Sequence, residues 1–335
     1  MTKIHLETFG QGKSIVLVHG WAMHTGIWRD FAKQLALNYQ VTCIDLPGHG
    51  HSELIDPFTL ERISAELLKA IPGQGCCWLG WSLGATVVLD VAARYPERVS
   101  SLVLLAGNPL FPSSGSRLYT QAPTGHRHSG MDCRNPDYMD VCSSPSMALG
   151  NCSMHCSTSC IHAVVDTCFP AGMTNYLDTF VYKDENFSLE TETWPGMDVQ
   201  LLDDFAEQLN KNCQATLLRF LSLQVNGLPE HKALLKALKS AVFECDAPDQ
   251  NTLQGGLDIL KQADLRPVLS GLTMPVSVIL GGLDTLVPVA VGQKMQQLLP
   301  SLELNIIDRA GHVPFLSHSR ETLAIISRFM DQRCS

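Results

Sequence analysis

The chain has 335 residues, of which 45% are hydrophobic and 17% charged, with a formal net charge of −9 and a pI near 5.7. This composition excludes general disorder, because the apolar fraction is large enough to form a sizeable core. The negative charge argues against a nucleic-acid binder, which needs a basic field to attract phosphate. No apolar stretch is long enough to cross a bilayer and the first residues carry no signal-peptide pattern, so we expect a cytoplasmic protein without membrane segments.

Short apolar strands alternate with helical segments along most of the chain. The expected strands are 15–19, 41–45, 76–80, 101–106, 276–281 and 302–308, and the expected helices include 28–37, 60–70, 85–95 and 290–298. Such alternation is typical of a mostly parallel sheet with helices on both faces. Because catalytic groups gather at the carboxyl ends of strands in such sheets, the end of each strand is a candidate site.

A serine between two glycines follows the third expected strand, in Gly80-Trp81-Ser82-Leu83-Gly84. A sharp strand-to-helix turn brings two backbones close together, so the positions two residues before and after the serine must lack bulk. The turn lifts the hydroxyl above the sheet edge and directs the first helical N–H groups beside it. The pattern predicts a nucleophile elbow, and an ordinary glycine-flanked turn is the alternative.

A serine hydroxyl needs a base and an acid at other strand ends before it can attack a carbonyl. His312, in "DRAGHVPF" after the last expected strand, is the predicted base. Asp284, at the end of "VSVILGGLD", is the predicted acid, and Asp308 is its competitor but stands close to the histidine in the chain. The resulting order of serine, acid and histidine is that of α/β-hydrolases.

Charge that develops on the carbonyl oxygen during attack requires preset N–H donors. The backbone N–H of Leu83, which follows the nucleophile, is one predicted donor. The second is the backbone N–H of Trp21, in the "HGWAM" loop after the first expected strand. These residues predict an oxyanion hole.

Two segments interrupt the alternation. Within 197–261, three stretches with helical periodicity (201–209, 215–223 and 231–243) lack an intervening strand, which predicts a helical lid over the strand ends. Residues 112–192 are rich in Ser, Thr, Gly, Pro, Cys and Met and have weak periodicity, which indicates an insertion at the functional edge of the sheet. The expected organisation is therefore a core in two parts (1–111 and 263–335), the insertion (112–192) and the lid (193–262).

Six of the twelve cysteines crowd into the insertion, namely Cys133, Cys142, Cys152, Cys156, Cys160 and Cys168. Spacings of four residues with His155 and His162 nearby leave a zinc site open, although the usual paired C-x-x-C pattern is missing. The same composition also fits a disulfide-stapled module in an oxidising compartment, or a poorly ordered insertion without function. We expect neither a metal nor an organic cofactor in the active site.

With these residues in view, the chain resembles the α/β-hydrolase superfamily and, more narrowly, the pimeloyl-[acyl-carrier protein] methyl ester esterases of biotin synthesis. The resemblance covers about three quarters of the chain and is carried by "VLVHGWAMHTGIW", "DLPGHGHS", "WLGWSLGATV", "YPERVSSLVLLAGNP", "ETWPGM", "LRFLSLQ", "LQGGLDILKQADLR", "GGLDTLVP" and "AGHVPF". The tryptophan in the elbow, "ETWPGM" and "RFLSLQ" are specific to the narrower family. The segment 112–192 departs from the family, in which "NPLF" would run almost directly into "ETWPGM".

The resemblance implies a monomeric serine esterase that releases methanol from a pimeloyl methyl ester attached to an acyl-carrier protein. By matching positions, the substrate would contact Trp21, Ser82, Leu83, His312 and the stretch Phe220, Leu221, Ser222, Leu223 and Gln224. Acyl-carrier proteins are acidic, so basic residues of the lid would contact them, with Arg219 at a matched position and Lys232 and Lys236 more loosely matched.

Other functions reuse the same residues. A general short-chain carboxylesterase, a lactone hydrolase and a carbon–carbon bond hydrolase all need the same triad. A non-catalytic binding protein on the hydrolase fold belongs to a different class, and a missing triad residue would be its expected sign. Every member of the predicted triad is present here.

Overall fold

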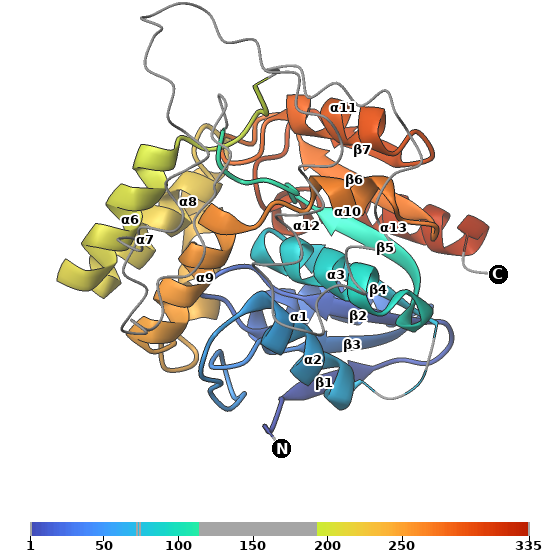
Figure 1. The fold of residues 1–335 in the computed structure, drawn as a ribbon, viewed down its shortest axis with the longest axis horizontal. Coiled ribbons are helices and arrows are strands. Elements are labelled where there is room, and N and C mark those ends of the chain that lie inside the picture. The colour runs from blue at the N-terminus through green and yellow to red at the C-terminus, as the bar shows by residue number, and fades with distance from the viewer. Residues whose placement is uncertain (1, 72, 74, 114–192, 334–335) are drawn as a thin grey trace, which may run out of the picture. The chain divides into compact units, whose positions relative to one another are not determined.

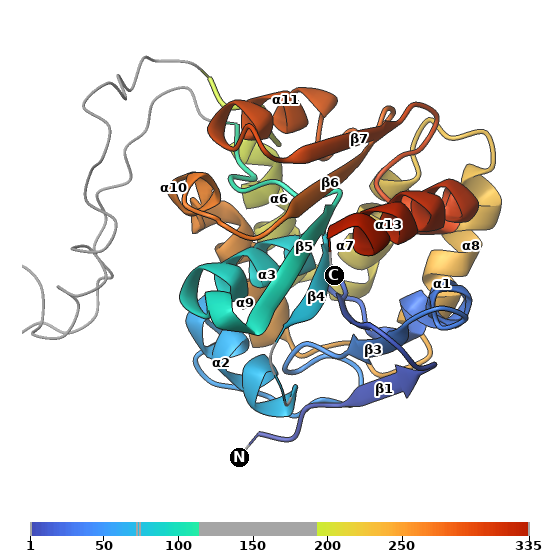
Figure 2. The same ribbon diagram turned by 90° about the vertical axis from the view of Figure 1, so that its right-hand side faces the viewer.

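Seven strands form one sheet in the computed structural model, which describes residues 2–71, 73, 75–113 and 193–333 (Figures 1 and 2). The order across the sheet is β1-β3-β2-β4-β5-β6-β7. β1 pairs with β3 in the antiparallel direction, and all other pairs are parallel. The strands are β1 (Leu6–Phe9), β2 (Ser14–Val18), β3 (Gln40–Ile44), β4 (Cys76–Trp81), β5 (Val99–Leu105), β6 (Val276–Gly281) and β7 (Glu303–Ile307).

The central strands are apolar on both sides because helices cover both faces of the sheet. Along β4, Trp78 contributes to the core cluster on one face, whereas Leu79 and Trp81 contribute to the cluster on the other. β2 divides in the same way, with Val16 on the first face and Leu17 on the second. Both faces are therefore packed cores, and only the strand ends are left for chemistry.

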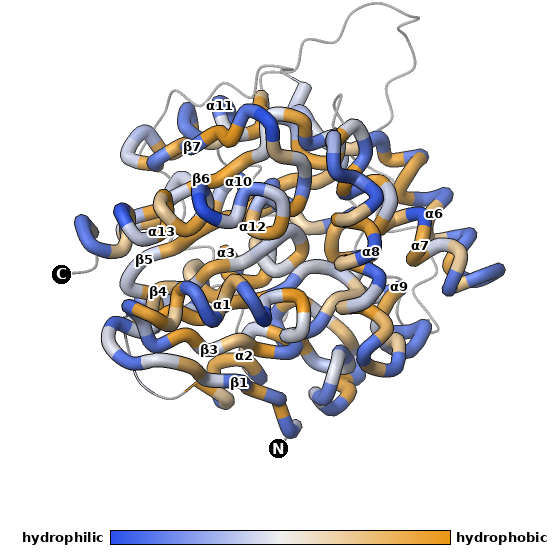
Figure 3. The backbone as a smooth tube through the Cα atoms, turned by 180° about the vertical axis from the view of Figure 1, so that it is seen from behind, coloured by the Kyte–Doolittle hydropathy of each residue, from blue (hydrophilic) through white to orange (hydrophobic). Residues whose placement is uncertain are grey.

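Helices cover the two faces in separate groups, which Figure 2 shows on either side of the sheet. One group packs with the cluster that contains Trp78 and comprises α2 (Leu60–Ala70), α3 (Leu83–Arg94), α10 (Arg266–Ser270) and α11 (Val289–Leu298). The other group packs with the cluster that contains Trp81 and comprises the 3-10 helix η1 (Thr25–Trp28), α1 (Arg29–Leu35), α12 (Pro314–Ser317) and α13 (Ser319–Arg333). A second 3-10 helix, η2 (Pro96–Arg98), precedes β5. In Figure 3 the strands are mostly orange, while much of the polar colour lies on the surrounding helices and loops.

Four further helices stand between β5 and β6 in the chain, namely α6 (Val199–Lys211), α7 (Cys213–Gln224), α8 (His231–Val242) and α9 (Gln250–Gln262). They lie together at one side of the sheet in Figure 1. α7 and α8 pack against each other, and α9 also reaches α3, the helix that follows the elbow. The three helical stretches predicted for the lid correspond to α6, α7 and α8, and α9 is a fourth helix of the same segment.

The predicted strands and helices agree with the described elements to within a few residues. The insertion at 112–192 lies almost entirely outside the described residues, as do its six cysteines, so the zinc, disulfide and non-functional interpretations of that segment stay predictions. Of the scattered cysteines, Cys43, Cys76, Cys213 and Cys245 are free thiols. In the described part of the chain, each helix is too short or too polar to span a bilayer.

Candidate active site

Ser82 occupies the turn between β4 and α3 with a left-handed backbone, at φ 56° and ψ −117°. A Cβ on Gly80 would lie 2.1 Å from the carbonyl oxygen of Gly84, and a Cβ on Gly84 would lie 2.3 Å from the carbonyl oxygen of Val18. Both distances are far inside van der Waals contact, so the two flanking positions require glycine. The turn is a nucleophile elbow in its geometry, and Ser82 is only 3% exposed.

His312 and Asp284 reach this serine from the ends of two neighbouring strands. The Nε2 atom of His312 lies 2.9 Å from Ser82 Oγ, and its Nδ1 atom lies 2.8 Å from Asp284 Oδ2. All three side chains are buried. The structure therefore brings together the serine, histidine and aspartate that the strand ends predict, although the three are far apart in the chain.

The carboxylate of Asp284 is held at both oxygens. Oδ1 accepts backbone N–H groups from Leu286 at 2.8 Å and Val287 at 3.0 Å, which leaves Oδ2 for the imidazole. An ionised carboxylate only accepts hydrogen bonds, so Nδ1 of His312 carries the proton that faces it. In the neutral imidazole Nε2 then has a free lone pair, and it is the acceptor for the hydroxyl proton of Ser82.

The two predicted oxyanion donors come from different elements, the start of α3 and the turn after β2. Leu83 is the first residue of α3, where a helix leaves its backbone N–H groups without partners in a preceding turn. Trp21 follows β2 in a tight turn closed by the hydrogen bond from Met23 N–H to Gly20 C=O at 3.2 Å. The indole N–H of Trp21 donates to the carbonyl of Leu253 in α9 at 2.8 Å, so a lid helix fixes the side chain of this loop.

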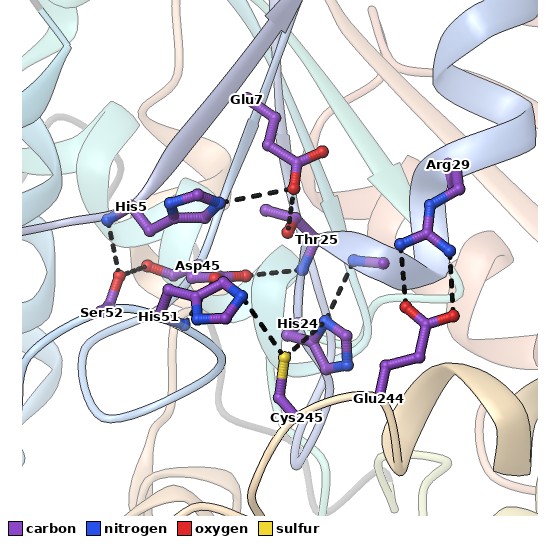
Figure 4. Close-up of polar contacts among 11 residues, drawn as sticks. His5, Glu7, His24, Thr25, Arg29, Asp45, His51, Ser52, Glu244 and Cys245 are labelled. Carbon is purple, nitrogen blue, oxygen red and sulfur yellow. Dashed lines mark hydrogen bonds and ion pairs between the residues drawn. The ribbon is translucent and has the colours of Figure 1, made fainter.

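Polar contacts hold the end of this loop and the helices η1 and α1 that follow it to the lid and to the residue after β3 (Figure 4). Thr25 N–H donates to Asp45 Oδ1 at 2.6 Å, and the ring of His24 donates from Nε2 to the carbonyl of Ala241 at the end of α8. Arg29 forms two hydrogen bonds, of 2.9 and 2.8 Å, with the carboxylate of Glu244. The hydrogen bonds from Arg29 hold the pKa of Glu244 below its ordinary value.

Cys245 stands in the same cluster, with its Sγ 3.9 Å from His24 Nδ1 and 3.7 Å from His51 Nε2 (Figure 4). Burial, as the largest cause, raises the pKa of this thiol, which disfavours the reactive thiolate. The His24 Nδ1 atom already accepts the backbone N–H of Gly26 at 3.1 Å. Within residues 2–71, 73, 75–113 and 193–333, no group of three His, Cys, Asp or Glu side chains is arranged to hold a metal ion.

Two fully buried histidines support the loops at these strand ends. The ring of His19 accepts Leu46 N–H at Nε2, at 2.9 Å, and donates from Nδ1 to Gly20 C=O at 2.8 Å, so this ring is neutral. His49 packs beside it with ring centroids 5.3 Å apart. Burial lowers the pKa of each of these two histidines to about 3.

A small apolar cavity opens next to Ser82. Its lining consists of the serine and eight hydrophobic side chains from the lid and the neighbouring loops, namely Phe111, Met197, Leu202, Phe205, Phe220, Leu257, Leu260 and Leu286. An uncharged wall of this kind suits a hydrocarbon chain and disfavours an ionised group. Sequence reasoning missed most of these residues, because an apolar side chain in a lid helix has the same pattern whether it lines a cavity or a core.

The chain enters and leaves the insertion beside this cavity. Met197 N–H donates to Phe111 C=O at 2.8 Å, and Ser113 N–H donates to Met197 C=O at 2.7 Å. Both Phe111 and Met197 line the cavity. The stretches "NPLF" and "ETWPGM" therefore lie next to each other in the structure. They are also nearly consecutive in the family that the sequence resembles, and this could have identified Phe111 and Met197 as neighbours.

The stretch 220–224, which is predicted to contact the substrate, lies on α7, and its side chains point in different directions. Phe220 lines the cavity and packs edge-on against Trp21 with ring centroids 4.9 Å apart, whereas Leu221 joins the core on the other face of the sheet. Ser222 is exposed and its hydroxyl donates to the carbonyl of its own helix at Leu218, and Leu223 is partly buried. Only part of this stretch thus faces the cavity.

Gln224 is buried at the end of α7, and its backbone carbonyl accepts the N–H of His312 at 3.3 Å. Neither Nε2 nor Oε1 of its amide has a hydrogen-bond partner within the described residues. A buried amide without partners is costly, and a bound polar group would satisfy it.

The three cations predicted to contact a carrier protein are exposed on the lid. Lys232 and Lys236 stand on α8, and Arg219 stands on α7 with its guanidinium 5.4 Å above the ring of Phe205. Phe205 lines the cavity, so this cation lies close to the apolar site. The structure places the cations on adjoining helices, since α7 packs against α8.

Comparison with known proteins connects this geometry to a family. A profile described as "Alpha/beta hydrolase family" matches residues 15–325. Pimeloyl-[acyl-carrier protein] methyl ester esterase from Methylococcus capsulatus is 32% identical over 98% of this chain and 98% of its own length, and the protein of that name from Citrobacter koseri is 31% identical over 96% and 95%. The solved esterase from Exiguobacterium antarcticum shares the fold, with a TM-score of 0.67 and 16% identity over 98% of this chain and 96% of its own. The chain therefore belongs to the alpha/beta hydrolase family, as a carboxylic ester hydrolase.

Proposed function

We propose that the chain is a serine esterase that removes the methyl group from a pimeloyl methyl ester carried on acyl-carrier protein, as a step of biotin synthesis. The observation that carries the chemistry is the chain of hydrogen bonds from Asp284 through His312 to Ser82 beside an apolar cavity. The observation that carries the substrate is the name shared by relatives that match the chain over nearly its whole length.

In the first half of the reaction, Nε2 of His312 takes the proton of Ser82 while Oγ attacks the ester carbonyl carbon. Asp284 keeps the imidazole oriented and stabilises its positive form. The backbone N–H groups of Leu83 and Trp21 bind the oxyanion as the carbonyl becomes tetrahedral. The bond from carbon to the methoxy oxygen then breaks, and methanol leaves with the proton from His312.

In the second half, a water molecule loses a proton to Nε2 of His312 and attacks the acyl group on Ser82. The bond to Oγ breaks, Oγ recovers the proton, and the free acid is released. The overall reaction consumes one ester and one water and yields one acid and one methanol. The free acid ionises at neutral pH, and its charge disfavours a return to the apolar cavity.

The chemistry of the proposed partner suits the lid. A carrier protein would approach the mouth of the cavity, where the acyl chain enters, and the carrier's acidic surface would meet exposed cations. Arg219, Lys232 and Lys236 offer such charges on a protein whose overall net charge is −9. A local field of opposite sign raises the association rate and favours one orientation of the partner.

The test compares two substrates and one variant. We expect the kcat/KM for pimeloyl methyl ester on acyl-carrier protein to exceed that for a p-nitrophenyl ester of similar chain length. Ser82→Ala is expected to lower kcat by on the order of 10⁴-fold or more while thermal unfolding stays unchanged, because only the nucleophile is lost. Turnover of the carrier-linked ester is measured by mass spectrometry of the carrier protein, which detects loss of the methyl group that leaves as methanol.

Each arm has an outcome that contradicts the proposal. Substantial turnover by a correctly folded Ser82→Ala variant would remove the serine mechanism. A preference for the p-nitrophenyl ester, together with no turnover of the carrier-linked substrate, would instead identify a general short-chain esterase.

A further inference from the structure

The tryptophan inside the elbow has a contact that the mechanism above does not use. The indole N–H of Trp81 donates to the backbone carbonyl of His312 at 2.8 Å. Trp81 is 1% exposed and immediately precedes Ser82 in the chain. One residue thus joins the strand that carries the nucleophile to the loop that carries the base.

The main chain of His312 is held on both sides. The indole N–H of Trp81 donates to the carbonyl of His312, and the backbone N–H of His312 donates to the carbonyl of Gln224 in the lid. The imidazole itself must keep its two contacts, at 2.8 Å to Asp284 and 2.9 Å to Ser82. A fixed peptide restricts where the ring can lie, and a displacement of about 1 Å in such a site can cost about a hundredfold in rate.

Trp81 also contacts the loop that carries the oxyanion donor. A Cβ on Gly20 would lie 3.1 Å from Cε3 of the indole, so the ring packs directly against the backbone that leads to Trp21. The ring also packs against Phe315 and Trp28, with centroids 5.0 and 6.2 Å away. The indole is therefore held in one position by packing, and it is suited to hold the Gly20 backbone and the peptide of His312 in place.

We propose that Trp81 is a positioning residue, whose indole N–H sets the place of His312 relative to Ser82. The inference rests on the proposed serine esterase mechanism, and it assigns a role to a side chain whose ring also packs beside the imidazole of His312, with centroids 5.9 Å apart. Its contribution is to the chemical step, so it affects kcat and leaves substrate binding nearly unchanged.

Two other tryptophans offer matched controls. Trp78 stands on the same strand but faces the opposite core, and its indole N–H donates to the carbonyl of Arg98 at 3.2 Å. Trp28 packs in the same aromatic cluster as Trp81, and its indole N–H has no partner within the described residues. Trp78→Phe therefore removes a similar hydrogen bond away from the site, and Trp28→Phe removes similar packing without a hydrogen bond.

The experiment measures kcat, KM and thermal unfolding for Trp81→Phe and both controls. The kinetic assays use an ester substrate at a temperature well below the unfolding midpoint of each variant. We expect Trp81→Phe to lower kcat about 10- to 100-fold with KM within about twofold, because only alignment of the base is lost. The two controls are expected to keep kcat within about threefold of the value for the original enzyme. This is expected even where their stability falls as much as that of Trp81→Phe. Phosphonylation of Ser82 by a fluorophosphonate, which also needs the base, is expected to slow in Trp81→Phe alone.

A second variant covers the case in which Trp81→Phe does not fold. Site-specific 3-benzothienylalanine at position 81 keeps the shape of the indole and replaces the N–H with sulfur, and the same loss of kcat is expected. Full kcat in this variant, or an equal loss of kcat in all three phenylalanine variants, overturns the inference. Activity that survives Ser82→Ala overturns the proposed function itself, so the two failures are distinguishable.

Discussion

At the scale of single residues, the amide of Gln224 combines burial with a lack of hydrogen-bond partners in the described part of the chain. We predict that Gln224→Met raises the midpoint of thermal unfolding by about 1–3 °C, because an unsatisfied amide is replaced by an apolar group of similar length. The same change is expected to raise KM for the ester, because the amide is then no longer available to the substrate. Differential scanning calorimetry and steady-state kinetics measure the two effects.

Gln214 supplies the control for this prediction, since it stands on the same helix and is exposed. Gln214→Met should leave both the unfolding midpoint and KM nearly unchanged. A lower midpoint with an unaltered KM in Gln224→Met would show that the amide has a structural partner and no part in binding.

Some single residues can be predicted from sequence and others cannot. Ser82, Asp284 and His312 follow strands, and the carboxyl ends of parallel strands share one edge of a sheet, so their convergence follows from the topology. The bond from Trp81 to His312 depends instead on where two rings settle in the core. Nothing in the pattern of apolar residues distinguishes an indole that only fills space from one that also holds a peptide.

At the scale of elements, α8 presents cations on its outer side and packs its apolar side against the core. Leu234, Leu238 and Val242 are buried, whereas Lys232 and Lys236 are exposed. We predict that Lys236→Glu raises KM for the carrier-linked ester several-fold and leaves that for a p-nitrophenyl ester unchanged, because only the carrier protein is charged. The difference is expected to shrink as salt is added.

Lys13→Glu provides the matched change of charge. Lys13 is exposed just before β2, at the amino edge of the parallel strands, on the side away from Ser82. Equal effects of the two substitutions on the carrier-linked substrate would indicate that net charge alone matters, and would contradict a contact on α8.

Most of the elements were predictable because their periodicity is strong, but the antiparallel edge strand β1 was not among the expected strands. Strands β4 and β6 and helix α2 begin or end within a residue of the expected positions. The arrangement of the lid was not predictable in the same way. Its helices have amphipathic faces, but which face meets η1, α3 or the cavity depends on contacts between segments far apart in the chain.

At the scale of the whole molecule, the buried pair His19 and His49 links stability to pH. Burial lowers the pKa of both to about 3, whereas an unfolded histidine titrates near 6.5. Between these two pKa values the unfolded chain binds more protons than the folded chain, so the free energy of unfolding rises with pH. The stability that the two neutral rings contribute is therefore lost as the pH falls from about 6.5 towards 3. Each histidine changes the unfolding equilibrium constant by up to about tenfold per pH unit in this window.

Denaturant unfolding at pH 7, 6 and 5 measures this dependence. We predict a shallower dependence for His49→Gln, which removes one of the two titrating groups, and an unchanged one for His231→Gln, whose histidine is exposed on α8. A slope that is identical in all three proteins would contradict the assignment to the buried pair.

The pairing of Phe111 with Met197 has a consequence for how this chain can vary. Hydrogen bonds of 2.8 and 2.7 Å among Phe111, Ser113 and Met197 join the two flanks of the segment 114–192, after β5 and before α6. These bonds hold the two flanks together, whereas the register between β5 and β6 is set by the direct pairing of the two strands. The junction lies beside the cavity next to Ser82, so a segment of another length can be joined at these two flanks without a change in the pairing of β5 with β6.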